Sequence, residues 1–412
     1  MRKNSFYERA LVALFFTLAL YTIALKSTLG LPQIGEFAIF KPEHADWRDV
    51  CIGAGRPCFR MTTAILGQTI EGVYAWLAGF FFWDVASSTL FAGSPWAIND
   101  IPRDKVTNLI IPICAQVSLF LVLLYPLLLI CRRAFTGFPE RVLFLMATFS
   151  VLIGWYPDAV NLWFKFASVF IDWPRSYYLF ATKAFHYDFG TICILLLGIL
   201  YLARSAHPSL SVIAVLAALM QATMEHLGIV FTLGVLFAGI FNTLNTTGRR
   251  NWRRPLLEGL TAISAAVGAA IILSVAFYAL SGTTDATVGS PDNATGFLSE
   301  KWWSVVENNL LWIRTITANV ISMAILPAIS GIAIGIIAGW RNRTAERAKR
   351  NDDFRIAMIA SGMIVGYMLT TVAGLFFVAY PAEMGRQFLA LAVLTVIAVA
   401  KFTEVALARV RV

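Results

Sequence analysis

The chain has 412 residues, of which 58% are apolar and only 14% are Asp, Glu, Lys or Arg. Soluble domains carry about a quarter charged residues and just under half apolar ones, so this composition excludes a secreted soluble enzyme, a disordered regulator and a fibrous protein. The net charge of +9 would suggest nucleic acid in a soluble protein. In a protein with many membrane spans it is typical of basic cytoplasmic loops, and we expect no nucleic-acid partner.

Long apolar runs follow one another along the chain. The first, at about residues 10–24, follows a basic N-terminus as a signal peptide does, but it lacks a small-x-small cleavage site and more runs follow, so we interpret it as a transmembrane helix. We therefore predict an all-α fold, a polytopic transmembrane helical bundle of about ten spans, with residues 1–412 forming a single integral membrane domain. The later runs lie at about 107–131, 141–156, 188–203, 209–224, 226–245, 256–280, 310–340, 354–379 and 387–408.

Three of these runs are irregular. The runs 209–224 and 226–245 are barely separated, which predicts a tight helical hairpin or one broken helix. The run 310–340 is too long for one crossing of about 20 residues, and we expect Pro327 to kink it. Gly331-Ile-Ala-Ile-Gly335 fits the small-xxx-small pattern of closely packed membrane helices.

The segments between the runs differ in character. Residues 25–106 form the predicted first outer loop, in which the apolar but charge-interrupted stretch 61–93 suggests an interfacial or re-entrant helix. Residues 155–187 are also amphipathic, so we expect amphipathic interfacial helices on the outer face. Residues 281–306 are a further predicted outer loop, and 341–355 a basic cytoplasmic loop attracted to anionic lipid.

The orientation follows from the basic residues. If the N-terminus is cytoplasmic, more than half of all Lys and Arg residues fall in short inner loops, so we expect both termini in the cytoplasm. All tryptophans except Trp252 and Trp340 then fall on or near the outer face. The outer side is therefore the elaborate one, and we expect the function there.

Two cysteines lie in the predicted first outer loop. Cys51 and Cys58 enclose a short Gly- and Pro-containing segment, and an oxidising outer compartment would permit a disulfide between them. A metal site needs more ligands than this loop provides, since His44 is the only nearby imidazole, so we expect no metal here.

Charged residues in a bilayer are costly and often mark function, so those near the outer ends of spans are the main candidates. Glu225 and His226 lie between the two close-set spans. They could form a turn in water. Alternatively, because the flanking MQATMEHLGIVF is half apolar, they could position or deprotonate a hydroxyl group. Neighbours on a helix point about 100° apart, so we favour Glu225 as the group that faces a shared cavity.

Four further candidates lie near outer span ends. Arg386 is either an interfacial anchor or a guanidinium that binds a lipid phosphate through two hydrogen bonds. His186 and Asp188 are two residues apart and would meet only on an extended or turn backbone; otherwise they form a wet loop in which Asp188 caps the next helix. Asp158 follows the span that ends near residue 156.

The sequence contains no P-loop, no dinucleotide-binding GxGxxG after a strand, no HExxH and no GxSxG. An ATP-driven machine is therefore not expected unless another subunit supplies the motor.

Three segments resemble bacterial polytopic proteins related to the GT-C class of membrane glycosyltransferases. They are Tyr177-Tyr178-Leu-Phe-Ala-Thr before a span, MQATMEHLGIVFTLGVLFAG, and YPAEMGRQFLALAVLTVIAVA near the end. The resemblance implies a multi-pass enzyme of the bacterial cytoplasmic membrane. It would transfer a sugar from a polyprenyl-phosphate donor to a glycan, lipid or protein acceptor at the outer face.

Enzymes of that class usually carry an acidic residue in the first outer loop as general base or metal ligand. Here the resemblance assigns that role to Asp46 or Asp49, which are three residues apart and could share a helical face. It also implies a divalent cation as a candidate cofactor, with membrane lipids and the lipid-linked donor as partners.

Two other functions remain open. A secondary transporter or flippase would place ionisable residues near the midplane, on broken helices of matching halves, whereas the charges here lie toward the outer face. A non-catalytic subunit of a cell-envelope glycan assembly would use its surface helices as docking sites.

Overall fold

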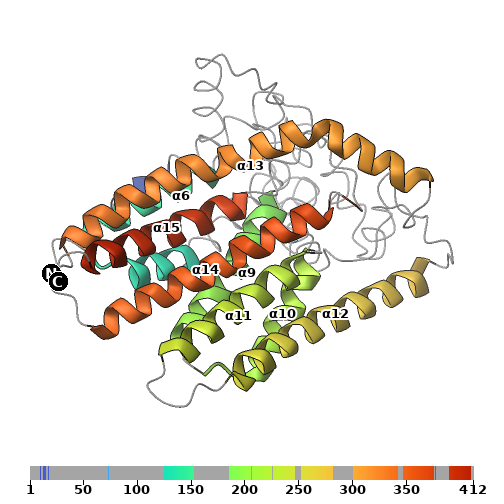
Figure 1. Cartoon of the computed structure of the whole chain (residues 1–412), viewed down its shortest axis with the longest axis horizontal. Helices are drawn as coiled ribbons and strands as arrows, with labels where there is room; N and C mark the ends of the chain where they lie inside the picture. Colours follow the sequence, from blue (N-terminus) through green and yellow to red (C-terminus); the bar gives the residue numbers. More distant parts are fainter. Residues whose placement is uncertain are drawn as a thin grey trace, which may run out of the picture.

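The computed structural model describes residues 125–152, 185–205, 207–224, 226–245, 252–281, 300–341, 347–374 and 389–409, together with residues 10, 13, 14, 17, 73 and 376. Among these residues there is no strand, and all except short connections are helical. This confirms the all-α prediction for the part of the chain described. Residues 125–134 are helical, and the other helices are α6 (Phe138–Leu152), α9 (Phe185–Arg204), α10 (Leu210–Thr223), α11 (Leu227–Asn245), α12 (Arg253–Ser281), α13 (Glu300–Arg341), α14 (Arg347–Gly374) and α15 (Leu389–Arg409) (Figure 1).

Four stretches within the described helices are long and apolar enough to cross a bilayer. This identifies the chain as a membrane protein. The total of about ten spans and the outer interfacial helices remain predictions. The four stretches are Leu227–Asn245, Arg253–Ala276, Arg350–Gly374 and Ala390–Ala408.

Two predicted loops are partly helical. The helix α14 begins at Arg347, so it includes most of the basic stretch 341–355, and α13 begins at Glu300, inside the predicted outer loop 281–306. The start of α14 is charged, whereas the start of α13 combines Glu and Lys with Trp and Val. Glu, Lys, Arg and Ala are strong helix formers whatever their hydropathy, which is why helices continue where the apolar runs end.

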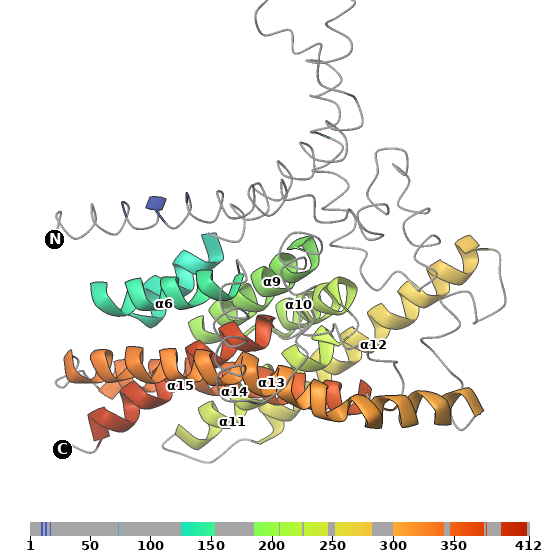
Figure 2. The same ribbon diagram turned by 90° about the horizontal axis from the view of Figure 1, so that it is seen from above.

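The helices form adjoining layers (Figures 1 and 2). In the middle, α14 packs against α11 on one side and α15 on the other, while α9 contacts α10, α11, α14 and α15. At one edge α13 packs on α15 and α6, and at the opposite edge α12 packs on α10 and α11.

Glycines bring the helix backbones together. A Cβ atom on Gly335 of α13 would lie 2.5 Å from the carbonyl oxygen of Ala400 in α15, and one on Gly331 would lie 3.0 Å from that of Val396. This confirms the predicted small-xxx-small packing, and the matching order of contacts makes α13 and α15 parallel. On α14, a Cβ on Gly362 would lie 2.5 Å from the carbonyl oxygen of Leu233 in α11.

The connection between α9 and α10 lies at one end of the bundle, together with the starts of α12 and α14, whose side chains bind carbonyl oxygens of that connection. Arg355, near the start of α14, donates to the carbonyl oxygen of Ser205 between α9 and α10. Arg254, at the start of α12, donates to that of Pro208 in the same connection. We call this the inner end, because it carries the basic residues predicted to be cytoplasmic, and the opposite end the outer end.

Candidate functional site

The two close-set spans form a helical hairpin, the first of the two predicted alternatives. Helix α10 ends at Thr223, Met224 has an extended backbone (φ −159°, ψ 142°), and α11 begins at Leu227. The beginning of α10 and the end of α11 both lie near the start of α12, since Arg254 binds the Pro208 carbonyl and a Cβ on Gly239 would meet Pro255. We call residues 224–226 the hairpin tip.

The hairpin tip lies below the outer end of the bundle. Helix α10 has 14 residues, which at 1.5 Å per residue span about 21 Å, less than the hydrocarbon thickness of about 30 Å. Helix α12 starts at the same inner end and has 29 residues, a length of about 44 Å. In Figure 1, α12 and α13 both extend beyond α10 and α11. The tip therefore lies short of the far ends of α12 and α13.

The surroundings of the hairpin tip are mostly apolar. Met224 and Leu227 are buried, and His226 is half-buried. The His226 ring lies edge-on to the Tyr367 ring of α14, with centroids 5.2 Å apart and an interplanar angle of 67°. Thr191 of α9 directs its hydroxyl toward the Met224 sulfur at 4.0 Å. His226 is therefore held between helices, which is unlike a turn fully exposed to water.

The other predicted site residues are placed as follows. His186 and Asp188 both lie in the first turn of α9, which begins at Phe185. The backbone there is helical and not the extended or turn form on which residues two apart could meet, and Asp188 is inside the helix rather than its cap. The candidates outside the described residues are Glu225, Arg386, Asp158, Asp46, Asp49, Cys51 and Cys58.

The inner end contains a buried ionic cluster that the sequence analysis missed. The Lys401 ammonium of α15 lies 2.9 Å from Asp353 Oδ1 of α14 and 2.7 Å from Glu404 Oε2. These three residues are 0%, 5% and 4% exposed, and the Lys401 Nζ lies 4.8 Å from the centroid of the Phe135 ring. The opposite charges of Lys401 and Glu404, three apart within an apolar run, were the signal that could have found it.

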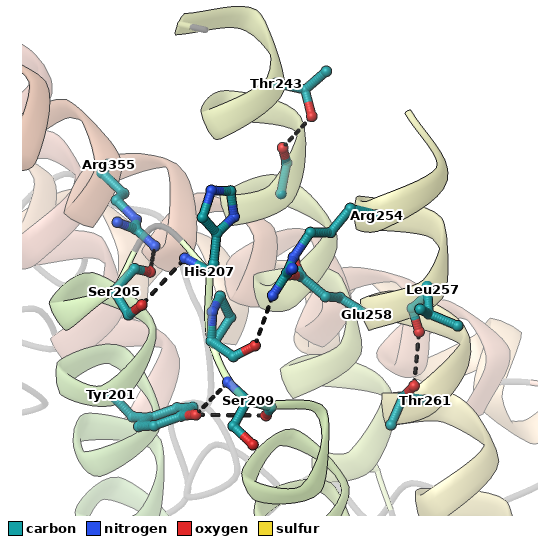
Figure 3. A network of polar contacts seen from close by, with 12 residues as sticks. Tyr201, Ser205, His207, Ser209, Thr243, Arg254, Leu257, Glu258, Thr261 and Arg355 are labelled. Carbon is teal, nitrogen blue, oxygen red and sulfur yellow. Dashed lines mark hydrogen bonds and ion pairs between the residues drawn. The ribbon is translucent and has the colours of Figure 1, made fainter. Parts of the chain in front are cut away.

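Arginines bind the backbone carbonyls between α9 and α10 (Figure 3). Besides Arg355 on Ser205, Arg133 Nη2 donates to the Ala203 carbonyl at 2.8 Å, and Arg254 Nη2 to that of Pro208 at 3.3 Å. Ala203 lies in the last turn of α9, where carbonyls have no partner within the helix, and the guanidinium groups bind it and two carbonyls of the segment that follows.

Arg254 and Arg341 also form ion pairs at this end. Arg254 Nε binds Glu258 Oε1 at 2.9 Å within α12. Arg341 of α13 lies 3.1 Å from Glu140 Oε2 of α6 and donates to the Thr136 hydroxyl at 2.6 Å. Arginines at this end therefore join α12 and α14 to the segment that follows α9, and α13 to α6.

The variant Arg355→Leu tests whether Arg355 holds the connection between α9 and α10 in place. The His207 amide donates to the Ser205 hydroxyl, and the Ser209 amide donates to the Tyr201 hydroxyl. Both amides are expected to exchange with water when the connection between α9 and α10 opens. A hydrogen bond from a charged group contributes about 1.5–3 kcal/mol, so we expect both amides to exchange at least about tenfold faster in the variant. The measurement is hydrogen exchange by mass spectrometry.

The matched control is Arg204→Leu, which removes an exposed arginine from the last turn of α9. It should leave exchange at His207 and Ser209 unchanged. Equal exchange rates in the two variants would show that Arg355 does not hold the connection.

The two ends offer different chemistry. At the inner end the charged groups are occupied with one another and with carbonyls, which suits structural support. At the hairpin tip an imidazole lies among apolar residues, which suits binding or proton transfer to a hydroxyl. In the described residues no group of three or more His, Cys, Asp or Glu could hold a metal ion. Comparison with protein-family models, curated proteins and solved structures finds no match for this chain.

Proposed function

We propose that this membrane protein is a glycosyltransferase of the bacterial cytoplasmic membrane. It transfers a sugar from a polyprenyl-phosphate donor to a glycan, lipid or protein acceptor at the outer face. The observation that carries the proposal is the placement of the hairpin tip, with His226 packed on Tyr367 at a depth of about 21 Å from the inner end. A donor whose polyprenyl chain lies in the bilayer can reach such a site sideways from the outer leaflet.

The proposed roles follow from the chemistry of each group. Glu225 accepts the proton of the acceptor hydroxyl, whose oxygen then bonds to the anomeric carbon of the sugar as the bond from that carbon to the phosphate oxygen breaks. Arg386 binds the phosphate oxygens and stabilises the polyprenyl phosphate that leaves. His226, next to Glu225, orients the acceptor hydroxyl. Asp46 or Asp49 is the alternative base, with a divalent cation at the first outer loop.

The test is transfer of radiolabelled sugar by the purified protein from a panel of polyprenyl-phosphate sugars. Wild type should consume at least one donor. Because general-base catalysis contributes about 10²–10⁴-fold, Glu225→Gln should lower the rate by at least about 100-fold, and Arg386→Ala should raise the KM for the donor.

The control is Thr261→Ala, since Thr261 is on α12 and its hydroxyl binds only the Leu257 carbonyl within that helix among the described residues. It should keep full activity. A folded wild type that consumes no donor, or a Glu225→Gln variant that keeps the wild-type rate, would contradict the proposal.

A second candidate function is a secondary transporter or flippase for a lipid-linked or small solute. The buried cluster of Lys401, Asp353 and Glu404 favours it, because ionisable residues inside candidate spans often line ion or substrate pathways. Solute or lipid movement in liposomes that carry the protein, without sugar transfer, would select this function over the first.

A further inference from the structure

Two tryptophan–arginine pairs mark opposite edges of the bundle at its inner end. Trp252 and Arg253 lie at the start of α12, and Trp340 and Arg341 at the end of α13. Trp252 is 44% exposed and Trp340 is 58% exposed, and both arginines are exposed as well. Figure 1 shows α12 and α13 as the two edges of the layered bundle.

An exposed aliphatic strip adjoins each pair. On α12, Leu256 and Leu260 follow Trp252 at steps of four residues, and both are exposed. Side chains four apart lie on one face of a helix, so Trp252 and the two leucines form one strip along that edge, with Arg253 next to Trp252 in the chain.

On α13 a similar strip runs in the opposite chain direction. Ile336 and Ile332 precede Trp340 at the same steps of four residues, and both are exposed. Because α13 approaches the inner end and α12 leaves it, the two strips point the same way, from the inner end toward the middle of the bundle.

These three kinds of side chain match the parts of a phospholipid. Guanidinium groups bind phosphate through paired hydrogen bonds, indole rings prefer the headgroup level, and aliphatic side chains contact acyl chains. At the α12 edge the exposed Arg253 adds a positive charge that complements a net negative headgroup. At the α13 edge Arg341 also pairs with Glu140, so its hydrogen-bond donors contribute more than net charge. Zwitterionic lipids offer the same acyl chains without a net negative charge.

We propose that each edge binds an anionic phospholipid of the inner leaflet, with its phosphate at Arg253 or Arg341, its glycerol region at the indole and its acyl chains along the aliphatic strip. The inference does not depend on the proposed glycosyltransferase function. It also sets the inner boundary of the bilayer at the level of Trp252 and Trp340.

The test measures lipid binding to the purified full chain by native mass spectrometry, with phosphatidylglycerol and phosphatidylcholine as probes. Wild type should bind phosphatidylglycerol more tightly, and added salt should weaken that binding. A basic residue near an anionic surface contributes about 1 kcal/mol, so Trp252→Ala with Arg253→Gln should weaken phosphatidylglycerol binding about fivefold and phosphatidylcholine binding by less.

Trp340→Ala probes the other edge while keeping the ion pair of Arg341 with Glu140. The matched control is Trp303→Ala, since Trp303 is exposed on the same helix at a distance of about 55 Å from Trp340. It should bind phosphatidylglycerol as wild type does, and Trp340→Phe should keep most of the binding that Trp340→Ala loses.

Three results would overturn the proposal. The first is equal affinity of the wild-type protein for the two lipids. This result does not depend on whether any variant folds. The second is an equal loss in the Trp303→Ala control. The third is displacement of phosphatidylglycerol by millimolar inorganic phosphate, which would identify a site for free phosphate.

Discussion

Replacing Lys401 by methionine is expected to lower the free energy of unfolding by about 3–5 kcal/mol, because it leaves the carboxylates of Asp353 and Glu404 buried without the ammonium between them. All three side chains are almost fully buried, so water cannot replace the lost contacts. The measurement is denaturant unfolding of Lys401→Met and wild type in the same detergent.

The control removes the whole cluster at once, with Lys401→Met, Asp353→Asn and Glu404→Gln in one chain. Neutral side chains of similar size need no counter-charge, and removing all members of a buried ionic cluster is often close to neutral. The triple variant should therefore be more stable than Lys401→Met alone. A single variant as stable as wild type, or a triple variant no better than the single one, would show that the cluster contributes little.

Replacing Gly335 by leucine should lower the free energy of unfolding by about 3 kcal/mol, at the upper end of the usual cost of overpacking. A Cβ at this position would lie 2.5 Å from both the Ala400 carbonyl oxygen and the Thr403 Cβ. The first of these atoms is backbone and cannot rotate away, so α13 and α15 must separate. Thermal unfolding in detergent measures the change.

The matched control is Gly268→Leu on α12, where an added Cβ would meet nothing within 4 Å. Leucine has a higher helix propensity than glycine by somewhat less than 1 kcal/mol, so this variant should be as stable as wild type or slightly more stable. Similar losses in the two variants would mean that helix contact is not what requires glycine at residue 335.

The apolar parts of the described helices could be predicted from the lengths of the apolar runs, but the charged ends of the helices could not. The run predicted at 226–245 corresponds to α11, Leu227–Asn245, because an apolar stretch bounded by polar residues has only one way to cross a bilayer. Helix α13 begins about ten residues before its predicted run, at Glu300, since a segment rich in Glu, Lys and Trp is helical without being apolar.

The candidate site could be predicted only in part. The adjacency of two apolar runs indicated the break at residues 224–226, yet its depth depends on the 14-residue length of α10 relative to the longer helices beside it. The ring that His226 contacts belongs to Tyr367, 141 positions later in the chain, and no local pattern specifies such a pairing.

Lys401 shows the same limit at the inner end. Its chain neighbours are almost all apolar, so the run around it was interpreted as a simple span. Glu404 on the same helix was visible in the sequence, but Asp353 lies on α14 and reaches Lys401 only because α14 and α15 pack together. Pairings of this kind are tertiary, and they become evident only when the helices are placed.

The most direct test of an outer-face function at the hairpin tip is to measure from which side of the membrane a water-soluble reagent can reach the tip. In a cysteine-free background, His226→Cys and Ser209→Cys place single thiols at the tip and at the exposed inner connection. A membrane-impermeant maleimide added outside intact cells should label position 226 and leave position 209 unlabelled. Labelling of position 226 only from the cytoplasmic side, or of both positions from the same side, would contradict the proposed orientation and with it the outer-face glycosyltransferase.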